Sequence, residues 1–122
     1  MIDHVTLPVS DVAASKAFYI QALAPLGHEI LFEEPSCVGF GVPPKPEFFI
    51  VESASAITPI HVAFTSSKRS LVDLFYASAI AAGGRDNGKP ALCPEYHPNY
   101  YGGFVFDPDG HNIEAVCHTP EP

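Results

Sequence analysis

The stretch Pro59-Ile60-His61-Val62-Ala63-Phe64-Thr65 decides the fold, because it repeats the opening of the chain, Ile2-Asp3-His4-Val5-Thr6-Leu7-Pro8. His4 and His61 are 57 positions apart (61 − 4), and the same offset pairs further identical residues. These are Val5 with Val62, Ser10 with Ser67, Phe18 with Phe75, Tyr19 with Tyr76, Ala22 with Ala79, Ala24 with Ala81 and Gly27 with Gly84. Self-similarity at a fixed offset is typical of a repeated supersecondary unit. The sequence therefore predicts two copies of one unit.

The composition is that of one globular domain. A chain of 122 residues is too short for two independent cores, so we expect a single domain over 1–122 in which both units share a core. Hydrophobic residues make up 47% and charged residues 16%, which excludes a mainly disordered chain. With 14 acidic and 6 basic residues the net charge is −8. This charge disfavours nucleic acid and anionic membrane surfaces as partners and favours a small molecule.

Several targeting and redox signals are absent from the sequence. No apolar run reaches the length of a membrane span, and the N-terminus lacks the pattern of a secretory signal, so we expect no membrane association and a cytoplasmic location. Cys37, Cys93 and Cys117 lie far apart and form no C-x-x-C pair, so they are expected to be reduced thiols that pack in the fold.

Periodicity and turn residues give the order of elements. Module one (1–54) is predicted as a strand over 2–9, a helix over 12–24 capped by Ser10 or Asp11, and strands over 29–33, 38–42 and 47–52. A linker over 53–59 leads to module two (60–118), with a strand over 60–65, a helix over 68–82 capped by Ser66 or Ser67, a weak strand over 82–87, a loop over 88–101, and a hairpin of 103–107 and 112–117. Each module is β-α-β-β-β, which indicates an α+β fold.

Three residues with metal-ligand chemistry occupy related positions. Strand alternation puts His4 and His61 on the face away from the helices, and it puts Glu114 on that face of the last strand. Two imidazoles and a carboxylate form a common divalent-metal site that leaves positions open for a substrate. The alternative is that both histidines are ordinary strand residues and Glu114 is solvated; their symmetric placement favours the metal site.

The chain resembles the vicinal oxygen chelate superfamily, which contains glyoxalase I, extradiol dioxygenases, fosfomycin-resistance enzymes and bleomycin-binding proteins. The resemblance rests on His4-Val5-x-Leu7-x-Val9-x-Asp11, Phe18-Tyr19, His61-Val62-Ala63-Phe64, Gly83-Gly84 and Phe106-Asp107-Pro108-Asp109-Gly110-His111-Asn112-Ile113-Glu114. It implies paired β-α-β-β-β modules that form one incomplete eight-stranded barrel around a divalent metal ion.

The resemblance also implies roles for individual residues. The family's ligand positions fall on His4, His61 and Glu114, and the metal would be Fe, Mn, Ni or Zn. Internal symmetry makes Phe49 the counterpart of Glu114. Glyoxalase I supplies a carboxylate at that position, so Phe49 argues against glyoxalase I chemistry, and we expect Phe49 to contact substrate instead.

The loop over 88–101 supplies the remaining candidates. His97 and Tyr101 are candidate catalytic groups, and Tyr96 and Tyr100 are candidate substrate-binding groups, because imidazole and phenol side chains at the rim of a cup can orient a substrate or move its proton. An equally weighted alternative is a lid whose rings only pack. His28, His111 and His118 are expected at the surface, and Arg85 and Lys89 are expected to be solvated rather than to bind an anion.

The predicted function is that of a metal-dependent lyase, isomerase or dioxygenase that chelates two neighbouring oxygens of a small substrate. The main alternative is a protein of the same fold that binds a drug-like or antibiotic molecule without chemistry. A third possibility is a scaffold whose site is silent. A small-molecule substrate and a second copy of the chain, in a homodimer, are the partners considered.

Overall fold

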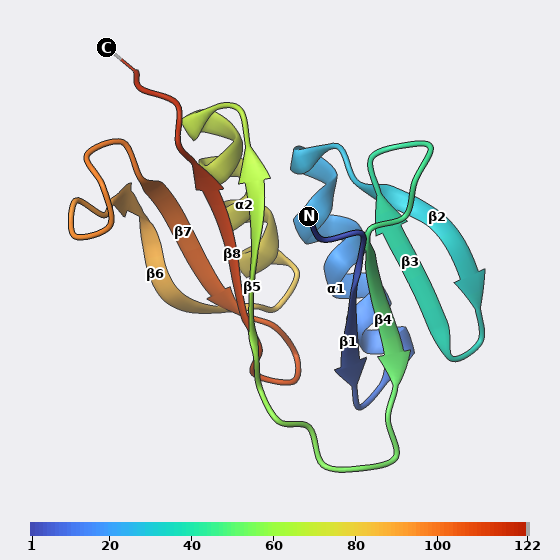
Figure 1. Cartoon of the computed structure of the whole chain (residues 1–122). Helices are drawn as coiled ribbons and strands as arrows, with labels where there is room; N and C mark the ends of the chain where they lie inside the picture. Colours follow the sequence, from blue (N-terminus) through green and yellow to red (C-terminus); the bar gives the residue numbers. More distant parts are fainter. Residues whose placement is uncertain (122) are drawn as a thin grey trace.

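The computed structural model of the chain describes residues 1–121 and contains two modules with the same order of elements (Figure 1). Module one consists of β1 (Val5–Val9), α1 (Val12–Leu23), a 3-10 turn η1 (Ala24–Leu26), β2 (Glu29–Glu34), β3 (Cys37–Gly41) and β4 (Phe48–Glu52). Module two consists of β5 (His61–Ser66), α2 (Arg69–Ala81), β6 (Arg85–Leu92), β7 (Tyr101–Phe106) and β8 (Asn112–Cys117). The predicted α+β class and the two β-α-β-β-β modules are confirmed.

Each module forms its own four-stranded mixed sheet. The strand orders are β1-β4-β3-β2 and β5-β8-β7-β6, and the first and last strand of each module pair in parallel. The edge strands β1 and β5 face each other across a hollow and run in opposite directions (Figure 1). Within residues 1–121 no ladder joins the two sheets, so the barrel of a single chain stays open.

The two modules share one core. Both helices lie on the same side of the sheets and contact each other (Figure 1). The largest fully buried apolar side chains come from both modules: Leu7, Phe18, Tyr19, Leu23, Phe40, Phe48, Ile50, Phe75 and Ile113. None of the described helices is long and apolar enough to cross a membrane. The opposite faces of the sheets carry His4, Phe49, His61 and Glu114, so they remain for a functional site.

The two helices begin differently. The Asp11 side chain accepts a hydrogen bond from Ala14 N at 3.2 Å, which satisfies one of the free amides of α1, as expected. The predicted serine cap of α2 is wrong, because Lys68 is its N-cap residue and makes no side-chain cap. Ser66 Oγ bonds to the backbone of Lys68 instead, and Glu121 in the C-terminal tail accepts from Arg69 N at 2.9 Å.

The second strand of module two is longer than predicted. β6 reaches Leu92, so the loop between β6 and β7 covers only 93–100. Two register shifts on either side of Gly88 disturb its pairing with β7, which explains why the sequence pattern is weak here. Gly88 has φ +145°, and a Cβ there would lie 3.0 Å from the Phe104 ring, so glycine is required at this bulge.

Candidate metal centre

The centre of the open face of module two holds a buried carboxylate between two donors. β5 and β8 are parallel neighbours, and Ala63 lies opposite Glu114. His61 is two residues before Ala63 in β5, so its side chain is on the same face of the sheet as Glu114. His61 Nε2 lies 2.7 Å from Glu114 Oε1, and the Tyr100 hydroxyl donates to Glu114 Oε2. Glu114 is fully buried, whereas half of the His61 side chain is exposed. Each carboxylate oxygen therefore has one partner, and only the His61 side opens to solvent.

The surroundings of Glu114 leave room only for this arrangement. Gly102 lies in β7 beside it, and a Cβ on Gly102 would lie 3.1 Å from Glu114 Oε2 and 3.1 Å from Tyr100 Cε1. Burial and the hydrogen bond to the Glu114 carboxylate raise the pKa of Tyr100 far above its usual value of 10.0. Tyr100 is therefore a proton donor to Glu114 throughout the neutral range.

Module one presents an apolar version of the same position. Thr6 lies opposite Phe49 in β4, as Ala63 lies opposite Glu114 in β8, so Phe49 is the structural counterpart of Glu114. The His4 ring meets the Phe49 ring edge-on, with centroids 5.5 Å apart, and His4 Nδ1 lies 2.7 Å from Asp3 Oδ1. His4 therefore contacts an aromatic ring where His61 contacts a carboxylate.

In a single chain His4 does not reach His61 and Glu114, so the expectation that these three side chains converge within one chain is wrong. β1 and β5 are antiparallel neighbours (Figure 1), which puts His4 and His61 at opposite ends of the seam. About five residues of strand at 3.3 Å each separate the two ends, or roughly 15 Å. Within residues 1–121 no group of three His, Cys, Asp or Glu side chains is placed to hold one metal ion.

The loop over 93–100 brings some of the predicted residues to Glu114 and not others. Tyr100 contacts Glu114 directly, and the Tyr96 ring lies 4.8 Å from the Tyr100 ring but is largely exposed. His97 contacts the Tyr100 ring at 5.6 Å, and its Nε2 is 2.8 Å from Nδ1 of His118. His97 therefore bonds to another histidine and reaches the carboxylate only through Tyr100.

Tyr101 lies on the other side of the sheet, which contradicts its predicted place beside the site. It is the first residue of β7 and pairs with the buried Cys117, so its side chain points toward α2. Its hydroxyl donates to Asp73 Oδ1 at 2.7 Å, and the Arg69 guanidinium lies 5.4 Å from its ring. Burial and the bond to Asp73 raise the pKa of Tyr101 to about 12. The extension of β7 by two residues decides this orientation.

One cavity opens on module two. It has a volume of about 350 Å³ and is lined by Asn87, Gly88, Lys89, Cys93, Glu95, Tyr96, Phe104 and Asn112. Glu114 does not line it, but Phe104, its cross-strand neighbour, does. Arg85 does not line it, because its guanidinium lies over the Phe106 ring at 5.1 Å. Lys89 does line it and is exposed to solvent, as expected.

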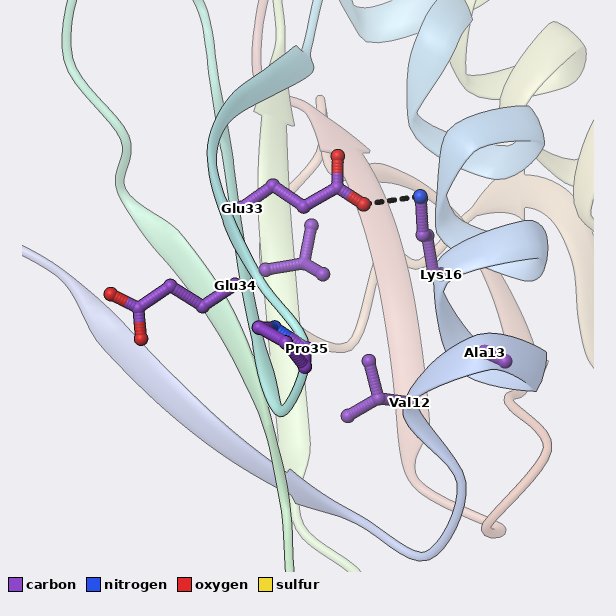
Figure 2. A pocket seen from close by; sticks show the side chains of 7 residues that line it. Val12, Ala13, Lys16, Glu33, Glu34 and Pro35 are labelled. Carbon is purple, nitrogen blue, oxygen red and sulfur yellow. Dashed lines mark hydrogen bonds and ion pairs between the residues drawn. The ribbon is translucent and has the colours of Figure 1, made fainter.

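Two other hollows lie away from Glu114. A cavity of about 310 Å³ follows the seam between β1 and β5, where His4 and His28 line one side and Phe64 and Thr65 the other. Another, of about 410 Å³, lies between α1 and the β2–β3 hairpin, and the ion pair of Lys16 and Glu33 spans it (Figure 2). The cavity in Figure 2 contains none of the predicted site residues.

The expectation that His111 lies at the surface is wrong, since this residue is fully buried. Its Nδ1 accepts from Ile60 N at 3.0 Å, so its Nε2 must carry the proton and donates to Pro8 O at 2.9 Å. It thereby ties the end of β1 to the start of β5. Strand alternation contained this signal, because His111 has the same parity as the buried residues Ile113 and Ala115. His28 is also half-buried, whereas His118 is exposed as expected.

Comparison with known proteins fits this architecture. The sequence profile of the Glyoxalase/Bleomycin resistance protein/Dioxygenase superfamily matches residues 1–115, and the chain belongs to this superfamily. A glyoxalase/bleomycin resistance protein from Albidiferax ferrireducens T118 is 26% identical, with a TM-score of 0.84 over 96% of this chain and 98% of that one. A glyoxalase-related enzyme from Fulvimarina pelagi is 22% identical, with a TM-score of 0.75 over 96% and 87%.

A third relative shows the same fold at lower identity. Lactoylglutathione lyase from Agrobacterium tumefaciens is 18% identical, with a TM-score of 0.71 over 96% of this chain and 92% of that one. No sequence match was found among curated proteins. The resemblance to the superfamily is therefore confirmed, and the superfamily consists mostly of enzymes.

Proposed function

We propose that the protein is a metal-dependent enzyme whose site forms between two copies of the chain. His61 and Glu114 of one copy and His4 of the other would hold one divalent ion, with Fe, Mn, Ni and Zn as candidates. The observation that carries this proposal is the 2.7 Å contact between His61 Nε2 and the buried Glu114 Oε1. The buried carboxylate and the exposed imidazole supply two of the three protein ligands of such a site, and the third must come from elsewhere.

The donor set fits a divalent ion once a second chain is present. Two imidazole nitrogens and one carboxylate oxygen suit Zn, Ni, Mn and Fe(II) alike. A two-fold axis would place module one of each chain over module two of the other, and such an isologous arrangement gives two equal sites per dimer. His4 lies on the open face of its own sheet, so it is available to a partner.

The chain's own residues would prepare this site. The Tyr100 hydroxyl occupies Glu114 Oε2, which leaves Oε1 and His61 Nε2 as the groups that face outward. Phe49 and Phe32, with ring centroids 6.0 Å apart, would form an apolar wall that excludes water from the opposite side. A bound ion would polarise two neighbouring substrate oxygens and stabilise negative charge that develops on them. We propose lyase, isomerase or dioxygenase chemistry on a small molecule.

Glyoxalase I chemistry is disfavoured by Phe49. This residue stands at the counterpart of Glu114, so module one supplies no carboxylate at the position where that enzyme has one. His97 and Tyr101 are poorly placed to serve as replacements, because one bonds to His118 and the other faces α2.

A second candidate function is the binding of an aromatic or drug-like molecule without chemistry. The observation that favours it is the aromatic face of module one, where Phe32 is 40% exposed and stands beside Phe49. Such a face provides stacking area for a ligand. Metal dependence separates the two functions, since a binder of this kind needs no ion.

A mixing experiment tests the shared site. The parent should bind one Mn(II) ion per chain in calorimetry and be a dimer by light scattering, and either His4→Ala or His61→Ala should weaken binding at least tenfold. If the site is shared, unfolding and refolding equal amounts of the two variants together should restore tight binding at about one quarter of the sites. Random pairing makes half of the dimers mixed, and each mixed dimer has one intact site out of two. No recovery on mixing, or unchanged affinity in either variant, would contradict the proposal.

A further inference from the structure

A pair of histidines closes the loop over 93–100 against the C-terminal tail. His97 lies in that loop, and His118 directly follows the last strand, β8. Nε2 of His97 is 2.8 Å from Nδ1 of His118, the ring centroids are 5.1 Å apart and the ring planes differ by 28°. The Tyr100 ring meets both imidazoles edge-on, at 5.6 Å and 5.3 Å. Two nitrogen donors therefore meet at an accessible edge of module two.

We propose that His97 and His118 form a second transition-metal site, separate from His61 and Glu114, for a borderline divalent ion such as Ni(II), Cu(II) or Zn(II). Bonds from such ions to imidazole nitrogen are about 2.0–2.1 Å long, and two of them at an angle between square and tetrahedral place the nitrogens about 3 Å apart. The observed 2.8 Å is close to this separation. Small rotations of two accessible rings are enough to aim both lone pairs at one point, and water completes the coordination.

The backbone around both rings is well held. Tyr100 N donates to His97 O at 3.2 Å, and Cys93 N donates to Tyr100 O at 2.7 Å, so the loop is closed by its own hydrogen bonds. On the other side, Cys117 is fully buried in β8, and Glu121 bonds to the start of α2. The two donors are therefore presented by ordered segments, which lowers the entropic cost of chelation.

The proton balance of binding follows from the hydrogen bonds. His97 Nδ1 accepts from Asn99 N at 3.1 Å, so Nε2 carries the proton that it shares with His118. An ion takes the place of that proton, which moves to Nδ1 of His97 so that the imidazole stays neutral. The loop gives up the Asn99 hydrogen bond and gains two metal bonds. The net charge of −8 favours the approach of a cation.

The proposed site would fasten the loop that carries Tyr100. An ion held by His97 and His118 joins the loop to the tail, and the Tyr100 ring lies against both imidazoles while its hydroxyl bonds to Glu114. Binding there should therefore restrict the residue that covers Glu114. This second site needs only one chain, so it stands independently of the shared site proposed above.

The test uses Ni(II) alone with the full chain in a His61→Ala background, which removes the first site. We expect one Ni(II) per chain in calorimetry, with paramagnetic broadening of amide resonances centred on residues 93–101 and 117–119. Adding His118→Ala should weaken this binding at least tenfold and abolish the broadening, and His97→Gln should do the same. The matched control adds His28→Gln, a half-buried histidine of module one that belongs to neither proposed site, and should leave both readouts unchanged.

Two outcomes would overturn the proposal. One is Ni(II) affinity that stays the same after both His118→Ala and His97→Gln in folded protein, as judged by far-ultraviolet circular dichroism. The other is broadening centred away from these two segments. Because the background lacks His61, neither outcome depends on whether the shared site exists.

Discussion

Module one and module two have the same strand order but opposite chemistry at the middle of their open faces. The row of paired residues across module one is Phe32, Gly39 and Phe49, and the corresponding row across module two is Gly88, Phe104 and Glu114. In module one a phenylalanine and then a glycine precede Phe49 in the row, whereas in module two a glycine and then a phenylalanine precede Glu114. The two faces thus keep a similar bulk while one is apolar and the other carries a carboxylate.

This difference shows how two copies of one module can take different roles, with an apolar surface in module one and a carboxylate in module two. In module one the Phe49 ring lies over Gly39, where a Cβ would be only 2.7 Å away, so the ring fills the space of a missing side chain. In module two Gly102 leaves space for Tyr100 to reach Glu114. The two glycines lie at different positions because Gly39 makes room for the Phe49 ring, whereas Gly102 makes room for Glu114 and Tyr100.

The modules also differ in how their last turns are used. The turn before β8 reaches into module one: Tyr19 donates to Asp107 Oδ2 at 2.6 Å, Ser10 N donates to Asp109 Oδ2 at 3.0 Å, and His111 donates to Pro8 O. The turn before β4 bonds within its own module, where Lys45 pairs with Asp3. The Asp-Pro-Asp-Gly-His segment therefore fastens the two modules together.

The largest expected effect is on stability and comes from removing the His111 hydrogen bonds that join the two modules. His111→Ala removes a fully buried ring, opens a cavity and leaves Ile60 N and Pro8 O without this partner, so the free energy of unfolding should fall by about 3 kcal/mol. Urea denaturation followed by circular dichroism measures this. The matched control is His118→Ala, an exposed histidine, which should change stability by less than about 0.5 kcal/mol. Equal effects of the two substitutions would show that His111 does not join the modules.

A smaller effect is expected from making the two modules alike. Phe49→Glu places a carboxylate beside His4 and gives the proposed shared site a fourth protein ligand, so divalent-metal affinity should rise about tenfold, or ~1.4 kcal/mol. Phe49→Gln, which has the same shape without the charge, should leave the affinity near that of the parent. Calorimetry with Mn(II) compares the three proteins. A carboxylate variant that binds no better than the glutamine variant would place Phe49 outside the ligand sphere.

Sequence reasoning predicted the elements that depend on local signals. The repeat at an offset of 57, the Asp11 cap and the alternation of strand residues placed both helices within a residue or two, and symmetry correctly paired Phe49 with Glu114. β6 was underestimated because two bulges around Gly88 break its alternation. Tyr101 was assigned to the loop because the strand was predicted to begin at residue 103, whereas β7 begins at Tyr101.

The separation of His4 from His61 and Glu114 in one chain could not be predicted from the sequence. Parity fixes which face of its own sheet a side chain occupies, and it does so correctly for Glu114 and His61, which contact each other. Parity says nothing about how the two sheets face each other. That relation depends on the packing of α1 against α2 and on the antiparallel course of β1 and β5, which are long-range features.

The smallest expected effect concerns pH and the seam between the modules. His28 follows η1, its ring meets Phe64 of module two edge-on at 5.4 Å, and within residues 1–121 its Nδ1 has no hydrogen-bond partner. Burial lowers the pKa of His28 below its usual 6.5, and nearby Glu47 opposes this shift only weakly. At the same offset of 57, module two has Arg85, which is exposed.

The sign of the effect follows from linkage. Because the folded pKa of His28 is lower than the unfolded one, the unfolded chain binds more protons between the two values, and stability decreases as the pH is lowered through that window. The stability contributed by neutral His28 is fully present above pH 6.5 and is lost as the pH falls toward the folded pKa. Urea denaturation between pH 7.5 and pH 5 should therefore show a shallower decline for His28→Gln than for the parent. Arg85→Gln should keep the parent's slope, and a parent slope identical to that of His28→Gln would mean that the seam leaves His28 as accessible to water as an unfolded histidine.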